Sequence, residues 1–146
     1  MPLNSKNPFL FYNPEMESKV EISFVKEGVS AGFPSPATDF METTIDLNKE
    51  LSKNPLATFY IKVSGNSMIN AGISDKDVLV VDRSLEPQNN KIAICFIDGE
   101  FTVKRIKIEE DKVLLMPENE KYKPIIITEE NELIIWGIVT YVIKHL

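Results

Sequence analysis

The sequence predicts a mainly β fold: a curled, mostly antiparallel sheet or a partly open barrel, with one short helix and an extended N-terminal arm. Short apolar runs of strand length recur after residue 57, and turn-forming residues separate them. A helical spacing of apolar residues precedes these runs. Five prolines interrupt the first 36 residues. These patterns favour one β-rich globular part preceded by an arm.

The arm is predicted to comprise residues 1–38. Its prolines break it up, and its apolar residues are too few and too scattered to form a core. We therefore expect it to lie on the globular part or on a partner. Residues 27–37 are small and end with two prolines, which favours an extended or turning chain over a helix. An extended segment suits a protease cleft, although composition alone favours a plain linker.

One helix is predicted within residues 39–52. Leu47 and Leu51 lie one helical turn apart, and either Thr44 or Asp46 can cap the first turn. An Asn-Pro pair follows and ends the helix.

The chain after the helix is predicted to form strands joined by short connections. Asp98-Gly99, between two apolar runs, is the strongest hairpin pattern. The predicted strands cover residues 58–63, 78–81, 92–97, 100–108, 112–116, 125–128 and 133–143.

Composition limits the class of protein. At 146 residues, the chain fits one domain with a real core. Its formal net charge of -6 repels nucleic acid. No apolar stretch reaches the roughly 18 residues of a membrane span, and the N-terminus lacks the pattern of a signal peptide. We expect a cytoplasmic protein in which the single cysteine, Cys95, is a buried and inert thiol.

Residues 64–68, Ser-Gly-Asn-Ser-Met, form the first candidate for a reactive site. They follow the predicted strand 58–63, where small residues let the backbone change direction sharply. Such a turn leaves the hydroxyl of Ser67 exposed beside backbone N–H groups, an arrangement that can present a nucleophile. Taken alone, the pentapeptide fits an ordinary turn better than a catalytic site.

A base for Ser67 must come from another side chain. The only histidine, His145, is next to the C-terminus, where a solvated side chain is expected, so a serine-histidine-carboxylate triad is disfavoured. Ligands for zinc are too few and no phosphate-binding loop is present, so no metal or cofactor is expected. Lys104 alternates with Thr102 and Ile106 on a largely apolar strand face, where desolvation lowers a lysine pKa. An edge-strand lysine that discourages aggregation gives the same pattern.

Several blocks of the sequence, in the same order, resemble the LexA/UmuD family of self-cleaving serine-lysine peptidases. The resemblance implies a fold like the LexA C-terminal domain, with Ser67 and Lys104 as the catalytic pair and Ala31-Gly32 as the scissile bond. Neutral Lys104 would take the Ser67 hydroxyl proton, Ser67 would attack the Ala31 carbonyl, and backbone N–H groups beside Ser67 would hold the oxyanion. The blocks are residues 64–68, 72–77, 98–105 and 115–119, with Tyr122 and Pro124.

The UmuD branch fits better than the LexA branch, because residues 1–31 contain no paired helices for a DNA-binding domain. The resemblance implies an arm, residues 1–31, removed by self-cleavage, and a peptidase and dimerisation domain, residues 32–146. It also implies a homodimer of the SOS response, whose cleavage is stimulated by a RecA filament on single-stranded DNA.

The product of this cleavage would be an accessory subunit of an error-prone translesion DNA polymerase with a Y-family, UmuC-like catalytic subunit. Neither direct sequence-specific DNA binding nor membrane association is expected. Two alternatives stay open: a non-catalytic LexA-like interaction and dimerisation module, and a serine-lysine protease that acts on other proteins.

Overall fold

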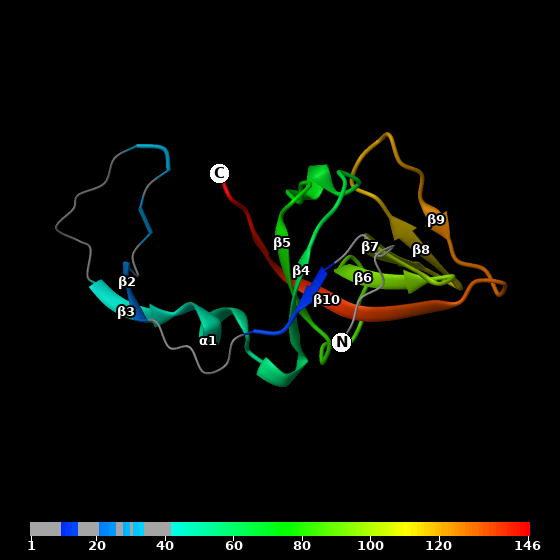
Figure 1. Cartoon of the computed structure of the whole chain (residues 1–146). Coiled ribbons are helices and arrows are strands. Elements are labelled where there is room, and N and C mark those ends of the chain that lie inside the picture. The colour runs from blue at the N-terminus through cyan, green and yellow to red at the C-terminus, as the bar shows by residue number, and fades with distance from the viewer. Residues whose placement is uncertain (1–9, 15–20, 26–27, 30, 34–41) are drawn as a thin grey trace.

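The computed structural model describes residues 10–14, 21–25, 28–29, 31–33 and 42–146. An eight-stranded sheet forms the body, with the strand order β1-β4-β5-β10-β6-β7-β8-β9, and β2 and β3 form a separate two-stranded sheet. Every recorded pairing is antiparallel. The sheet curls without closing into a barrel, so the predicted fold class is confirmed (Figure 1).

The elements of the described residues follow the order seen in Figure 1. The strands are β1 Leu10–Tyr12, β2 Glu21–Val25, β3 Glu42–Asp46, β4 Thr58–Lys62, β5 Val78–Asp82, β6 Ile92–Ile97, β7 Glu100–Glu109, β8 Lys112–Met116, β9 Ile125–Ile126 and β10 Leu133–Ile143. The helices are α1 Leu47–Leu51 and the 3-10 turns η2 Pro55–Ala57 and η3 Ile69–Ala71.

All seven strands predicted after residue 57 are present, and the bounds of β6, β8 and β10 match the prediction. The predicted hairpin joins β6 to β7, with Asp98 at φ 47° and Gly99 at φ 85°. Left-handed conformation at both central residues is what a tight two-residue hairpin turn requires.

The predicted helix is present as α1, which lies within residues 39–52. Residues 42–46 form β3, which pairs with β2, and α1 has only five residues; residues 39–41 lie outside the described residues. The backbone ladder with β2 satisfies the hydrogen bonds that a longer helix would have made internally. The predicted cap is present, because the Asp46 side chain accepts a hydrogen bond from Asn48 N at 3.0 Å.

Part of the arm lies on the globular body, which is one of the two positions that we expected for it. Phe11 and Tyr12 pair with Ile61 and Tyr60, so β1 adds a strand outside β4. The other described parts of the arm belong to a hairpin that stands to one side of the main sheet (Figure 1): β2, residues 28–29 and residues 31–33. The predictions for residues 1–9, 15–20, 26–27, 30 and 34–38 lie outside the described residues.

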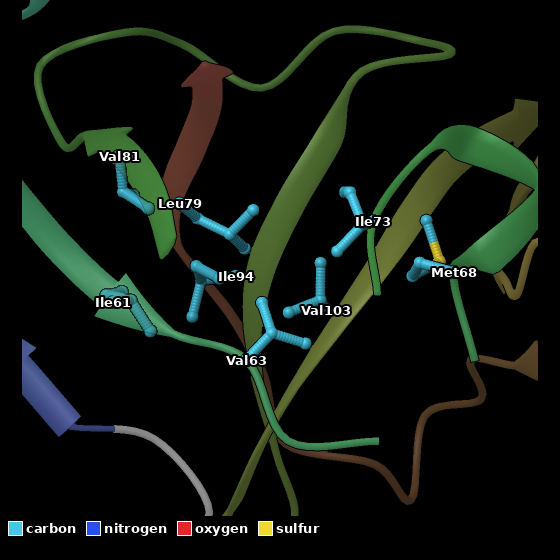
Figure 2. Packing of buried hydrophobic residues seen from close by; sticks show 8 residues of the cluster. All are labelled: Ile61, Val63, Met68, Ile73, Leu79, Val81, Ile94 and Val103. Carbon is cyan, nitrogen blue, oxygen red and sulfur yellow. The ribbon is translucent and has the colours of Figure 1, made fainter. Parts of the chain in front are cut away.

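The core consists of two clusters of buried side chains. Figure 2 shows eight side chains of its first cluster, drawn from β4, β5, β6, β7 and the loops around η3. Met68 and Ile73, which flank η3, are 2% and 1% exposed and pack in this cluster beside Val103. Burial of the residue directly after Ser67 therefore anchors the candidate turn to the core.

Cys95 lies in a second buried cluster with Ile106 and Leu115. Its side chain is 0% exposed, and burial raises the pKa of the thiol to about 12. The prediction of a buried and inert thiol is confirmed, because a protonated, inaccessible sulfur is a poor nucleophile.

Candidate active site

Ser67 lies on a sharp turn between β4 and η3. Gly65 makes the turn possible, because its φ of 97° lies in the left-handed region that side chains disfavour. The neighbouring Asn66 is exposed, whereas Ser67 is half-buried and Met68 is buried. The turn thus presents the Ser67 hydroxyl at the rim of the core.

A side-chain clamp fixes the shape of this turn. Asp75 Oδ1 accepts a hydrogen bond from Gly65 N at 2.7 Å, and Asn66 Oδ1 accepts one from Asp75 N at 3.1 Å. The two bonds run in opposite directions between the turn and the loop that follows η3. They satisfy backbone donors that the sharp turn leaves without partners in a ladder.

A second clamp comes from the loop after β8. Ser67 O accepts a hydrogen bond from Glu118 N at 2.8 Å, and Glu118 O accepts one from Asn70 N at 2.8 Å. Arg105 Nε donates to Glu118 Oε1 at 2.6 Å, which ties this loop to β7. The serine and the strand that carries Lys104 are therefore held in one hydrogen-bonded frame.

Lys104 reaches the turn from the middle of β7. Its side chain is 7% exposed, and its Nζ donates to Thr102 Oγ1 at 2.7 Å, to Val103 O at 3.0 Å and to Ser67 Oγ at 3.3 Å. The structure therefore brings together the two side chains selected from the sequence. Lys104 pairs across to Ala93 in β6, so it lies within the sheet and not on an edge strand.

The surroundings of Lys104 favour its neutral form. Burial lowers the pKa of Lys104 from its ordinary value, and the nearby Cys95 acts in the opposite direction. An amine held in an apolar pocket is easier to deprotonate because the ammonium loses its hydration there. Lys104 is thus placed and poised to exchange a proton with Ser67.

A small cavity of about 100 Å³ opens beside the Ser67 hydroxyl. It is lined by Val63, Ser64, Gly65, Ser67, Met68, Phe101, Thr102 and Val103. The walls come from the turn and from β7, and they include the hydroxyl-bearing residues Ser64, Ser67 and Thr102. A cavity of this size has room for a small side chain.

Ala31 and Gly32 lie away from this cavity. Both are exposed, as is Phe33, and a Cβ added to Gly32 would meet nothing within 4 Å. In Figure 1 residues 31–33 lie at the outer side of the β2–β3 hairpin. The structure thus brings Ser67 and Lys104 together without docking the predicted scissile bond against them.

Three supporting residues were not assigned roles from the sequence: Thr102, Asp75 and Glu118. Thr102 lies two residues from Lys104 on the same strand face, and this spacing is the signal in the sequence that could have indicated their contact. Asp75 and Glu118 act on residues ten and 51 positions away, and no local pattern reports such pairs.

His145 is exposed at the C-terminal end, as expected. Within the described residues, no helix is long and apolar enough to cross a membrane.

Comparison with known proteins gives consistent matches. A family model described as Peptidase S24-like matches residues 23–140. Protein ImpA of Salmonella typhimurium is 46% identical over 115 residues, which cover 79% of this chain and 78% of that protein. Protein MucA of Escherichia coli is 41% identical over 126 residues, 85% of this chain and 86% of MucA. Protein SamA of Salmonella typhimurium is 42% identical over 114 residues, 78% of this chain and 79% of SamA.

The matched region contains the Ser67 turn, the whole of β7 and both clamps. The resemblance to the LexA/UmuD family, with its UmuD-like members, is thereby confirmed. The chain belongs to the Peptidase S24-like family of serine peptidase-type proteins.

Proposed function

We propose that the protein cleaves its own chain between Ala31 and Gly32 with Ser67 as nucleophile and Lys104 as general base. The observation that carries this proposal is the contact of 3.3 Å between Nζ of the buried Lys104 and Ser67 Oγ. A lysine that must act as a base at neutral pH needs such desolvation, because an exposed lysine stays protonated.

The contacts of Nζ support a defined direction of proton transfer. A neutral amine has two N–H groups and one lone pair, and Thr102 Oγ1 and Val103 O are the two nearest acceptors of Nζ. When they accept both N–H groups, the lone pair faces Ser67 Oγ. After transfer, the ammonium has three donors for the same three oxygens, so the proton moves without rearrangement of either side chain.

The reaction then follows acyl transfer. Ser67 Oγ attacks the carbonyl carbon of Ala31, and the amide nitrogen of Gly32 leaves with the proton from Lys104. Water hydrolyses the resulting ester and frees Ser67. Among the described residues, the N–H groups of Ser67 and Met68 donate no recorded hydrogen bond, which leaves them available to hold the oxyanion.

The cavity beside Ser67 supports the choice of substrate bond. Its volume of about 100 Å³ suits the methyl group of Ala31, and the absence of a side chain on Gly32 allows close backbone approach. Since residues 31–33 are exposed and outside this cavity, cleavage requires the hairpin connection to move to Ser67 in the same chain or in a second copy.

The family membership supports a proposal for the biological role. We infer a UmuD-type role in SOS mutagenesis: a RecA filament on single-stranded DNA stimulates cleavage of a cytoplasmic homodimer, and residues 32–146 then serve as the accessory subunit of a Y-family, UmuC-like translesion polymerase. The acidic chain, with a net charge of -6, suits a protein that meets DNA through partners.

The test is the intact mass of the purified chain after incubation between pH 7 and pH 10, because higher pH deprotonates Lys104 without an activator. We expect two fragments that meet at Ala31 and Gly32, and neither fragment in Ser67→Ala or Lys104→Ala chains. A chain that stays whole at every pH and with an activated RecA filament contradicts self-cleavage and favours the non-catalytic module. Cleavage of added proteins alone favours a protease acting on other proteins.

A further inference from the structure

Strand β1 belongs to the part of the chain that the proposed cleavage would remove, yet it is built into the main sheet. Leu10, Phe11 and Tyr12 pair in register with Lys62, Ile61 and Tyr60 of β4. On its other side β4 pairs with β5. Removal of β1 would therefore turn β4 into an edge strand with unpaired backbone N–H and C=O groups.

Phe11 fills an aromatic slot in the body of the protein. Its ring centroid lies 5.1 Å from that of Phe101 and 4.9 Å from that of Trp136, and both contacts are edge-to-face or tilted. Phe59 completes the slot, with its centroid 5.0 Å from that of Trp136. Such aromatic pairs contribute roughly 0.5–1.5 kcal/mol each beyond their burial. Tyr12, the next residue, is 52% exposed and faces away.

The slot is shaped by an irregularity in β10. The register with β6 shifts between Ile135 and Gly137, so Trp136 is the extra residue of a bulge. A Cβ on Gly137 would approach Val81 Cγ1 to 2.5 Å, so only glycine fits beside the bulge without displacing its neighbour. Arg83 holds the indole from another side, with its Cζ 4.4 Å from the ring centroid and its Nε 2.9 Å from Trp136 O.

The slot also adjoins the candidate active site. Phe101, which contacts Phe11, lines the cavity beside Ser67. Its neighbour Thr102 accepts a hydrogen bond from Lys104. One wall residue is thus shared by the arm-binding slot and the cavity.

We propose that the edge of β4 and the slot between Phe59, Phe101 and Trp136 form a strand-binding groove. Residues 10–14 occupy it in the uncut chain, and after the arm departs it receives an extended segment of a partner protein. The proposal rests on removal of the arm in the proposed function. The seated β1 defines the chemistry of the partner: a β-strand that pairs with β4 and places an aromatic side chain at the position of Phe11.

The groove favours such a partner because an empty slot is costly. Removal of β1 would expose apolar aromatic faces and the hydrogen-bonding edge of β4 together, and a strand with one aromatic residue restores both. A partner helix could fill the slot but could not pair with the edge. This difference makes the groove selective for extended segments.

The test removes the arm without using Ser67. In a full-length Ser67→Ala chain, residues 26–32 are replaced by the seven-residue recognition sequence of a site-specific protease, and the released arm is separated after digestion. Trp136 is the only tryptophan of the chain, so its emission and its quenching by acrylamide report the slot directly. Because this cut is independent of Lys104 and Ser67, a failure of self-cleavage does not affect the result.

We expect removal of the arm to shift Trp136 emission to longer wavelength and to increase acrylamide quenching at least about two-fold. A synthetic peptide of residues 7–14 should reverse both changes. The Phe11→Ala peptide should bind at least about ten-fold more weakly, since truncation of a buried phenylalanine is costly. The Tyr12→Ala peptide is the matched control and should bind within about three-fold of the original.

Unchanged Trp136 emission after removal of the arm, or equal binding of the Phe11→Ala peptide, overturns the proposal. Recovery of the signal with rising protein concentration and no added peptide shows a second copy in the groove, and overturns the assignment to a foreign strand. If the cut chain loses its β-type circular dichroism, it has unfolded, and the slot is tested instead by Trp136 quenching in uncut Phe11→Ala and Tyr12→Ala chains. Only Phe11→Ala should increase Trp136 quenching, and equal quenching in both contradicts the slot.

Discussion

The Nζ atom of Lys104 lies 3.3 Å from Ser67 Oγ, although 36 residues separate the two in the chain. The lysine is 7% exposed, and no carboxylate contributes to its lowered pKa, which burial causes. The pair therefore differs from a surface ion pair, because a buried amine meets a neutral hydroxyl group and burial favours the uncharged amine. Four predictions follow from this arrangement and its supports.

Replacement of Lys104 by methionine should stabilise the fold at pH 7 and do so less at pH 10. The folded-state pKa of Lys104 lies below the value of 10.5 in an unfolded chain. Between these two values the unfolded chain binds a proton that the folded chain does not, so the stability of the parent rises with pH. Lys104→Met removes the cost of deprotonating and burying this amine, and we expect its free energy of unfolding to be about 1–3 kcal/mol higher at pH 7.

Thermal unfolding of Ser67→Ala and Ser67→Ala/Lys104→Met chains measures this gain, since neither protein can cut itself by the proposed route. Lys107→Met, at an exposed position of the same strand, is the matched control and should show no such pH dependence. An equal gain from Lys104→Met at pH 7 and pH 10 would contradict the neutral amine.

Replacement of Thr102 by valine should change the pH profile of cleavage as well as its rate. Thr102 Oγ1 accepts a hydrogen bond of 2.7 Å from Nζ, and this bond favours the ammonium. Its loss should lower the pKa of Lys104 further and move the midpoint of the rate profile to lower pH. The plateau should fall about five-fold, because the lone pair is oriented less well. Thr102→Ser retains the hydroxyl and should keep the midpoint; an unmoved midpoint in Thr102→Val would exclude this role.

Truncation of Asp75 should loosen the nucleophile turn. In Asp75→Ala, Gly65 N loses its acceptor at 2.7 Å, and we expect a loss of about 1 kcal/mol in the free energy of unfolding with slower cleavage. Asp75→Asn retains an oxygen at the same position and should lose much less of either. Denaturant unfolding and timed mass spectrometry separate the two effects. Equal behaviour of both variants would show that the contact does not support the turn.

Enlargement of Ala31 should block cleavage without affecting stability. The cavity beside Ser67 holds about 100 Å³, which suits a methyl group better than a phenyl ring, whereas Ala31 itself is exposed in the structure. We expect Ala31→Phe to slow cleavage at least about 100-fold and Ala31→Ser to slow it little, with equal melting temperatures. Rapid cleavage of Ala31→Phe at the same bond would show that another surface receives this side chain.

Local patterns were sufficient for the strands after residue 57 and for the largely apolar face of Lys104, whereas the choice of Lys104 as a base also needed the family resemblance. Alternation along β7 depends only on the pleat, so it placed Lys104 on the same face as Ile106 before any partner was known. Turn chemistry at Asp98 and Gly99 likewise fixed the β6–β7 hairpin, because few residue pairs adopt that conformation.

The contacts that make these elements into a site depend on distant parts of the chain. Residues 42–46 form a strand because β2 pairs with them, and β1 joins the sheet because β4 offers a free edge. The clamps from Asp75 and Glu118 and the packing of Phe11 on Trp136 arise only when the sheet curls. Backbone alternation is a local property of a strand, whereas side-chain partners across a curled sheet are decided by the packing of the whole chain.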